Sequence, residues 1–200
     1  MRRFIISLVA IFSLLGGNVM AESIDGRLGF IGRLGAVVPL ADSEIEGASF
    51  WLSDVGFAAG GGLIYGFGKH FAAEVEAIHM PSLDVKMASG DNVSEASFTD
   101  VSIGLLYRFM PEGRLVPYLG AGGDFVKGEI DSTTLEWAVG GHVRGGLDYF
   151  INKGIAFNID CKAIFTEESD ITMNGRTVGA FDPRSVITTF GVRLFLPDKI

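Results

Sequence analysis

Cysteine, proline and long hydrophobic runs are scarce in this chain of 200 residues. The single cysteine, Cys161, excludes a disulfide framework and any Cys-x-x-C metal or redox motif. Six prolines exclude a collagen-like or proline-rich chain. Beyond the first 21 residues there is no run of 18 apolar residues, so the sequence predicts no transmembrane helix.

Basic residues are also few. Sixteen Lys and Arg stand against 24 Asp and Glu, which gives a net charge of −8 and argues against a nucleic-acid partner. Only 20% of residues are charged while 48% are hydrophobic, and mean hydropathy is +0.37, so disorder is excluded. A positive mean hydropathy without a spanning helix directs attention to strands.

The first 21 residues have the pattern of a secretory signal peptide. Arg2 and Arg3 precede an apolar stretch from Phe4 to Leu15, and Val19-Met20-Ala21 supplies small residues at a cleavage site. We expect cleavage after Ala21, with an uncleaved anchor as the alternative, which leaves 22–200 as one domain. Removal of the two arginines would take the net charge to −10.

Eight segments alternate between apolar and polar or glycine residues with the period of β-strands. They span 27–38, 55–67, 71–77, 100–109, 115–125, 137–149, 155–165 and 186–196. Three connections are tight, at 68–70, 110–114 and 151–154, and four are long and polar, at 39–54, 81–98, 127–136 and 166–185. The sequence therefore predicts an all-β, eight-stranded antiparallel up-and-down barrel with short turns at one end and four long loops at the other.

The kinds of residue on the polar face distinguish a soluble barrel of the lipocalin type from a membrane barrel. This face is dense in glycine and carries isolated charges of both signs that nearly cancel, as an enclosed polar interior requires. Glycines leave room for long side chains inside a narrow barrel. We therefore expect the apolar face to contact lipid and the barrel to span a membrane. Aromatic residues near the strand ends agree with interfacial girdles, although strand propensity favours them too.

The four long loops are acidic. They hold 14 Asp and Glu against four Lys and Arg, so they account for the whole net charge of −10. An acidic rim could hold divalent cations shared with lipopolysaccharide, and simple solubility explains the same charges.

Several motifs of the second half resemble the OmpW family of small bacterial outer-membrane barrels. The motifs are Pro117-Tyr118-Leu119-Gly120-Ala121-Gly122, Trp137-Ala138-Val139-Gly140-Gly141, Gly145 to Asn152, Phe181-Asp182-Pro183 and Gly191 to Phe195. The resemblance implies a monomeric outer-membrane barrel with periplasmic termini and a narrow apolar channel that passes small hydrophobic molecules. It also implies an aromatic C-terminal residue, whereas Leu196 to Ile200 follow Phe195 here.

The strand directions divide the predicted interior into two zones. The loop-side half is apolar, and we expect it to line a channel for hydrophobic solutes: Val37, Ala58, Ile78, Met80, Ala138, Ile164 and Ile187. Below it we expect an ion-paired plug: Arg27, Arg33, Glu74, Glu76, Arg108, His142, Arg144, Asp148, Asp160, Lys162 and Arg193. A solute would then leave sideways into the bilayer. The alternative is that these side chains only fill the barrel.

An enzymatic function has little support in the sequence. His79, Ser82 and Asp84 form the one cluster that compares with a hydrolase triad, and nothing marks an oxyanion hole beside it. His70, His79 and His142 lack metal-ligand spacing, so no metal or cofactor is expected. The expected partners are outer-membrane lipid, lipopolysaccharide and small hydrophobic solutes. A non-conducting structural or adhesive barrel that acts through its loops is the alternative function.

Overall fold

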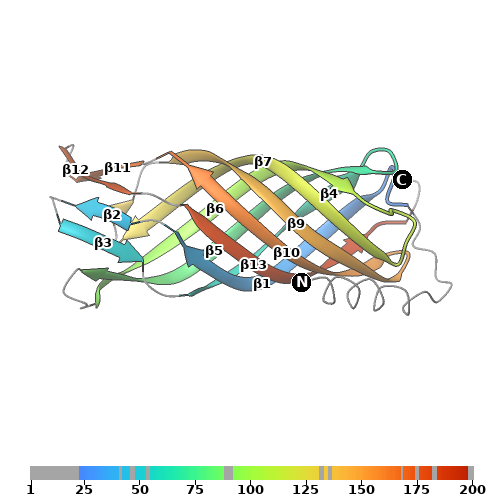
Figure 1. The fold of residues 1–200 in the computed structure, drawn as a ribbon, viewed down its shortest axis with the longest axis horizontal. Helices are drawn as coiled ribbons and strands as arrows, with labels where there is room; N and C mark the ends of the chain where they lie inside the picture. Colours follow the sequence, from blue (N-terminus) through green and yellow to red (C-terminus); the bar gives the residue numbers. More distant parts are fainter. Residues whose placement is uncertain are drawn as a thin grey trace, which may run out of the picture.

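The computed structural model describes residues 23–40, 42–45, 48–52, 55–87, 92–130, 133–134, 137–167, 169–173, 176–181 and 184–197. Their main feature is a barrel of eight long antiparallel strands that run obliquely to its long axis (Figure 1). The strands are β1 (Leu28–Pro39), β4 (Gly56–Gly66), β5 (Phe71–Met87), β6 (Asn92–Arg108), β7 (Leu115–Ile130), β9 (Ala138–Asn152), β10 (Ile155–Thr166) and β13 (Ser185–Phe195).

The sheet closes on itself. β1 pairs with both β4 and β13, the last long strand, and the circle is completed through β10, β9, β7, β6 and β5. Closure pairs each strand on both sides, which is what backbone groups need in lipid. The predicted eight-stranded antiparallel barrel is confirmed. Among the described residues no helix is long and apolar enough to cross a membrane.

Three strands are longer than the alternation predicted. β5, β6 and β7 continue into segments that we expected to be loops, at 81–98 and 127–130. The pairing of β5 with β6 shifts between Met80 and Leu83, so both of these side chains point inward although they are three residues apart. This irregularity interrupts the period of two, and it contains Pro81. Because proline is typical of loops, the sequence predicted a loop here.

Short strands also form within the predicted long loops. They are β2 (Asp42–Ile45), β3 (Ala48–Leu52), β8 (Thr133–Thr134), β11 (Ser169–Met173) and β12 (Arg176–Phe181). β3 pairs with the extended end of β5, and β2, β12 and β11 follow in the same sheet. The sheet thus extends beyond the barrel at the end opposite the tight turns (Figure 1).

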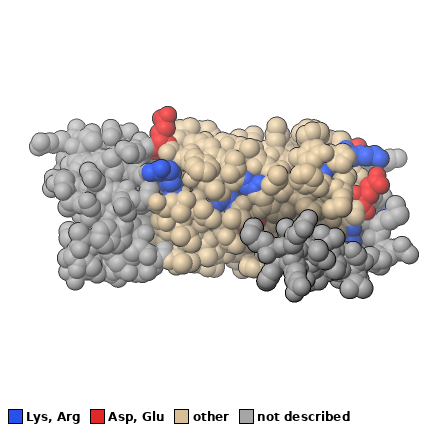
Figure 2. All heavy atoms as spheres, in the orientation of Figure 1, with Lys and Arg blue, Asp and Glu red and all other residues tan. Residues whose placement is uncertain are grey.

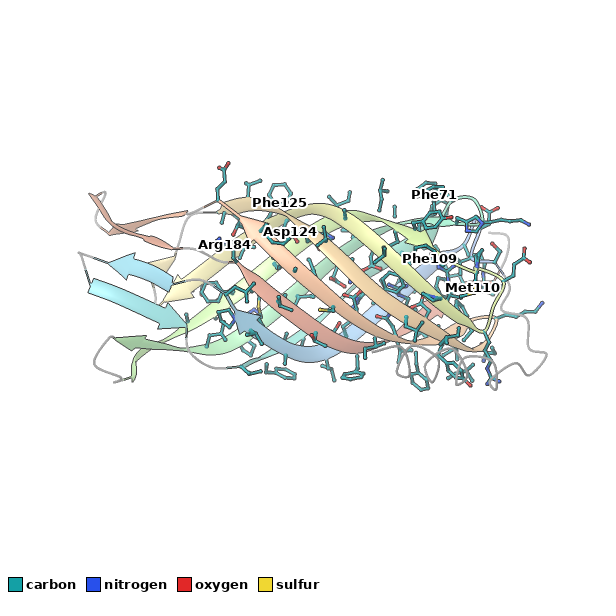
Figure 3. All side chains as sticks on the ribbon, in the orientation of Figure 1. Phe71, Phe109, Met110, Asp124, Phe125 and Arg184 are labelled. Carbon is teal, nitrogen blue, oxygen red and sulfur yellow. The ribbon has the colours of Figure 1, made fainter. Side chains whose placement is uncertain are left out.

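The outer wall of the barrel is apolar. Leu34, Leu119, Val143 and Phe190 are 54–65% exposed on it, and uncharged residues make up most of the visible described wall in Figure 2. On β7, the neighbours Asp124 and Phe125 are 0% and 45% exposed (Figure 3), as strand alternation requires. The predicted assignment of the apolar face to the outside is confirmed.

An aromatic cluster lies on the outer wall beside the tight turns. Phe71 and Tyr107 meet edge to face at 5.4 Å between ring centroids, with Phe67 stacked on Phe71 and Phe109 against Tyr107. All four rings are 40–48% exposed. The cluster lies beside the tight turns on the side of the barrel formed by β4, β5 and β6, where an interfacial girdle is expected.

Candidate functional site

The barrel interior has a polar zone between two apolar layers. The layer towards the long loops, called here the loop-side layer, has 0–5% exposed side chains and receives at least one from each of the eight barrel strands. Its members are Val37, Ala58, Ile78, Met80, Leu83, Ala96, Phe98, Val126, Ala138, Ile164 and Ile187. An apolar ring that involves every strand is unlike the polar interior of a water-filled porin.

The centre of the polar zone is a network of four arginines and four carboxylates, called here the arginine network. It consists of Arg33, Arg108, Arg144, Arg193, Glu74, Glu76, Asp148 and Asp160. Glu74 is its hub, because its two oxygens lie 2.6 Å from Arg33, 2.6 Å from Arg144 and 2.8 Å from Arg193. Asp148 pairs with Arg193 at 2.7 Å and lies 3.6 Å from Arg108.

Neutral side chains support the network from below. Tyr118 donates its hydroxyl to Asp160 Oδ2 over 2.5 Å. Asn158 donates to the Tyr118 oxygen at 3.0 Å and to Asp148 Oδ1 at 2.8 Å. The Arg193 guanidinium lies 4.8 Å over the Tyr118 ring. Such contacts satisfy lone pairs that ion pairs alone would leave open, which makes burial of these charges tolerable.

A second group of polar side chains borders the loop-side layer and is called here the boundary cluster: Asp100, Ser102, Asp124, His142 and Lys162. Lys162 Nζ lies 2.6 Å from Asp100, 2.8 Å from Asp124 and 2.9 Å from Ser102. His142 Nδ1 lies 2.8 Å from the other oxygen of Asp124. Asp100 is paired in register with Ile78 on β5 and Val126 on β7, which both belong to the loop-side layer. The boundary cluster therefore lies directly beside that layer.

Charge inside the described barrel is balanced. Six buried basic side chains face six buried acidic ones, with His142 counted as neutral. The predicted plug holds the same six basic residues but only four of the six carboxylates, because Asp100 and Asp124 were left out of it. Balance is expected where an unpaired charge would be costly.

Inward-facing glycines make room for the large polar side chains. A Cβ on Gly122 would lie 2.7 Å from the His142 ring, and one on Gly120 would lie 3.2 Å from Arg144 Cγ. A Cβ on Gly191 would lie 3.0 Å from Arg33 Cγ. The glycine-rich face of the strands is thus matched to the long side chains that cross it.

The turn-side layer closes the interior below the arginine network. It contains Ile24, Ile31, Ile64, Ala72, Leu106, Val116, Tyr118, Phe150, Ala156 and Phe195. Arg27 lies in this floor, where its guanidinium donates to the backbone oxygens of Leu196 at 2.9 Å and Lys153 at 2.7 Å. The chain segment before β1 is thereby joined to the end of β13 and to the turn between β9 and β10.

All seven predicted lining residues and all eleven predicted plug residues are buried inside the barrel. The seven lining residues lie together in the loop-side layer. The eleven plug residues are divided among the arginine network, the boundary cluster and the floor. The functional roles of both groups stay predictions. The sequence reasoning missed Leu83, Ala96 and Phe98 because they fell in a predicted loop, and Val126 because the fifth segment ended at Phe125. A continued alternation through Val126 was the available signal.

Of the cluster considered for catalysis, His79, Ser82 and Asp84, the structure describes only the side chain of His79. His79 is exposed on the outer wall, and its Nδ1 lies 3.0 Å from Thr99 Oγ1. The side chains of Ser82 and Asp84 lie outside the described residues. Within the described ranges, no group of three or more His, Cys, Asp and Glu side chains is placed to hold a metal ion.

Comparisons with known proteins identify the same kind of barrel. The family model described as outer membrane protein beta-barrel domain matches residues 7–181. A comparison with curated protein sequences gives no match.

Solved outer-membrane barrels share the fold. The outer membrane protein OprG from Pseudomonas aeruginosa aligns with a TM-score of 0.65 and 18% identity over 88% of this chain and 99% of that one. Neisserial surface protein A aligns with a TM-score of 0.60 and 14% identity over 84% and 96%. The E. coli outer membrane protein W aligns with a TM-score of 0.51 and 14% identity over 85% and 98%. At these identities the likeness shows a common fold alone.

Proposed function

Because the chain belongs to the outer membrane protein beta-barrel domain family, and is therefore a protein of the bacterial outer membrane, we propose that it admits small hydrophobic molecules into the loop-side half of its barrel. In this proposal the barrel is of the OmpW type, monomeric and non-enzymatic, and reaches the membrane with a cleaved leader, residues 1–21. Its partners are outer-membrane lipid, lipopolysaccharide and the solute.

The observation that carries the proposal is the loop-side layer. Eleven buried apolar side chains from all eight strands form it. A ligand site for hydrophobic solutes is mostly apolar with few polar groups, and an interior of eight strands has room for side chains or one small ligand. The layer therefore favours an apolar solute over an ion or a sugar.

The two zones below the layer oppose passage straight through the barrel. The arginine network fills the middle with paired charges, and the turn-side layer with Phe150 and Phe195 closes the other end. Moving an apolar molecule through would separate buried ion pairs, which costs several kcal/mol, about 3–5 for one broken pair. We propose that the solute instead leaves sideways between strands into the bilayer.

Solute flux into vesicles that contain the purified protein tests this function. Ile164→Asp or Ile187→Asp places a charge in the loop-side layer, and we expect either variant to abolish protein-dependent uptake of an apolar solute. Ile64→Asp is the matched control, because Ile64 is equally buried but lies in the turn-side layer, and uptake should persist. Folding of each variant is checked by circular dichroism. Uptake unchanged in both loop-side variants would overturn the proposal.

The acidic loops support a second candidate, an adhesive or structural barrel. Fourteen acidic residues in the four loop segments could bind cations or a cationic surface. Loop deletion distinguishes the two functions. Adhesion would vanish with the loops, whereas solute passage needs only the barrel.

A further inference from the structure

One carboxylate oxygen of the boundary cluster has neither a hydrogen bond nor an ion pair. Asp100 is fully buried, and its Oδ2 is paired with Lys162, but its Oδ1 has no hydrogen bond. Among the carboxylate oxygens buried in the described interior, Asp100 Oδ1 is the one with neither a hydrogen bond nor an ion pair. A buried acceptor left open is costly, so a group that donates to it would bind favourably.

No donor of the cluster reaches Asp100 Oδ1. Lys162 Nζ donates to Asp100 Oδ2 and Ser102 Oγ, and it forms an ion pair with Asp124 Oδ1 at 2.8 Å. When His142 Nδ1 carries its proton towards Asp124, Nε2 presents a lone pair, and Nε2 also has no partner. The cluster atoms without a hydrogen bond, Asp100 Oδ1, Asp124 Oδ1 and in this tautomer His142 Nε2, are thus all acceptors.

The charge of the cluster has the sign that attracts a cation. Lys162 alone faces Asp100 and Asp124, which leaves a formal charge of −1 when His142 is neutral. The arginine network has four basic and four acidic groups and needs no further counter-charge. A positive group at the boundary would balance its cluster without disturbing the network below.

The open acceptor adjoins the apolar layer. Asp100 is paired in register with Ile78 on β5 and Val126 on β7, and Phe98 lies two residues further towards the loops on the same face. On β13, Ile187 is the register partner of Lys162. A molecule with its head at Asp100 would therefore have its tail among loop-side residues.

We propose that the boundary cluster binds the protonated primary amine of a small amphipathic solute, with Asp100 as acceptor and the loop-side layer around the aliphatic tail. This inference rests on the proposed function and adds the head-group class of the solute. A primary ammonium supplies both the positive charge and the N–H donors that the cluster lacks, whereas a carboxylate would meet two carboxylates. His142 competes for the same role, since its protonation would neutralise the cluster without a ligand.

Calorimetric binding of four head groups on one C8 tail tests the proposal in phosphatidylcholine nanodiscs at pH 7. The probes are octylamine, octyltrimethylammonium, octanol and octanoate, and empty nanodiscs give the background from lipid. We expect octylamine to bind at least about tenfold more tightly than octyltrimethylammonium, which has the charge but no N–H donor. Asp100→Asn should remove this preference. Glu112→Gln, which removes an exposed carboxylate in a tight turn, should retain it.

Equal binding of octylamine and octyltrimethylammonium would overturn the proposal, as would tightest binding of octanoate. A histidine ring ¹⁵N spectrum that shows His142 doubly protonated in the ligand-free protein would also overturn it. If octanol binds as tightly as octylamine, the proposed function stands and the amine site fails. If none of the four probes binds, both the proposed function and the amine site fail. If Asp100→Asn does not fold, the head-group series on the unaltered protein decides alone.

Discussion

Glu74 on β5 and Arg144 on β9 meet at 2.6 Å across the barrel interior, although β6 and β7 separate their strands along the sheet. The same carboxylate also reaches Arg33 on β1 and Arg193 on β13. One side chain therefore ties together four of the eight strands. This arrangement makes the arginine network a support for the barrel from within.

Replacing Glu74 with alanine should strongly destabilise the protein. The change leaves three arginines short of a buried partner, and breaking a buried pair costs about 3–5 kcal/mol. Urea unfolding in lipid vesicles measures the free energy of unfolding. Glu112→Ala is the control, because its 3.1 Å contact with Lys69 is exposed and its loss should cost under about 1 kcal/mol. Equal effects of the two changes would contradict the account.

Gly146 and its neighbour Gly145 should respond differently to alanine. A Cβ on Gly146 would collide with the Tyr118 hydroxyl, which donates to Asp160, whereas a Cβ on Gly145 meets a flexible Leu119 methyl group at 3.1 Å. We expect Gly146→Ala to lower the unfolding free energy by about 1–3 kcal/mol. Gly145→Ala should have little effect or stabilise slightly. The same urea titration decides, and a larger loss at Gly145 would be contrary to this packing.

A charge on the outer wall should destabilise the barrel in lipid according to its depth. Val143 is 54% exposed on β9, well away from both ends of the strand, and Val143→Arg should cost about 2–4 kcal/mol if it faces the bilayer midplane. Ile151→Arg, beside the tight turn after β9, should cost about 0–1 kcal/mol. Both are measured by unfolding from vesicles. A solvated outer wall would instead tolerate the two substitutions alike.

Met110 has a backbone conformation that suits glycine. Its φ of 47° places it in the left-handed region, in the tight turn between β6 and β7. Left-handed backbone costs an L-residue roughly 1–2 kcal/mol, while glycine adopts it freely. Met110→Gly should therefore keep or raise the unfolding free energy, and Met110→Val should lower it by about 1 kcal/mol or more. A stabilising valine would refute this conformation.

Much of the fold could be predicted because the strand period of two is visible wherever one face meets lipid and the other a polar interior. Even in the glycine-rich segment of β7 the alternation holds, because Tyr118 and Asp124 are buried while Leu119 and Phe125 are exposed. The boundaries of the predicted loop at 81–98 could not be predicted, because the register shift at Met80 and Leu83 breaks the period while pairing continues. Loop strands such as β3 form by pairing with these extensions, which is a long-range effect.

The sequence predicts which side chains face the interior, but it does not predict which of them form ion pairs with each other. Alternation places Glu74, Arg144 and Asp160 on the inner face, but a sequence does not reveal which strands lie opposite each other across a closed barrel. Which arginine meets which carboxylate follows from the stagger of the strands. Asp100 shows the consequence, since its open oxygen is visible only once the three contacts of Lys162 are known.

Solute contact with the loop-side layer is the central claim, and isoleucine methyl NMR of the protein in nanodiscs tests it most directly. Ile78, Ile164 and Ile187 report on this layer, Ile24 and Ile64 on the turn-side layer, and Ile103 and Ile159 on the lipid face. Titration with a short alkane should shift the first three methyl resonances and leave Ile24 and Ile64 unchanged. Shifts confined to Ile103 and Ile159 would mean that the alkane stays in the lipid and would contradict the account.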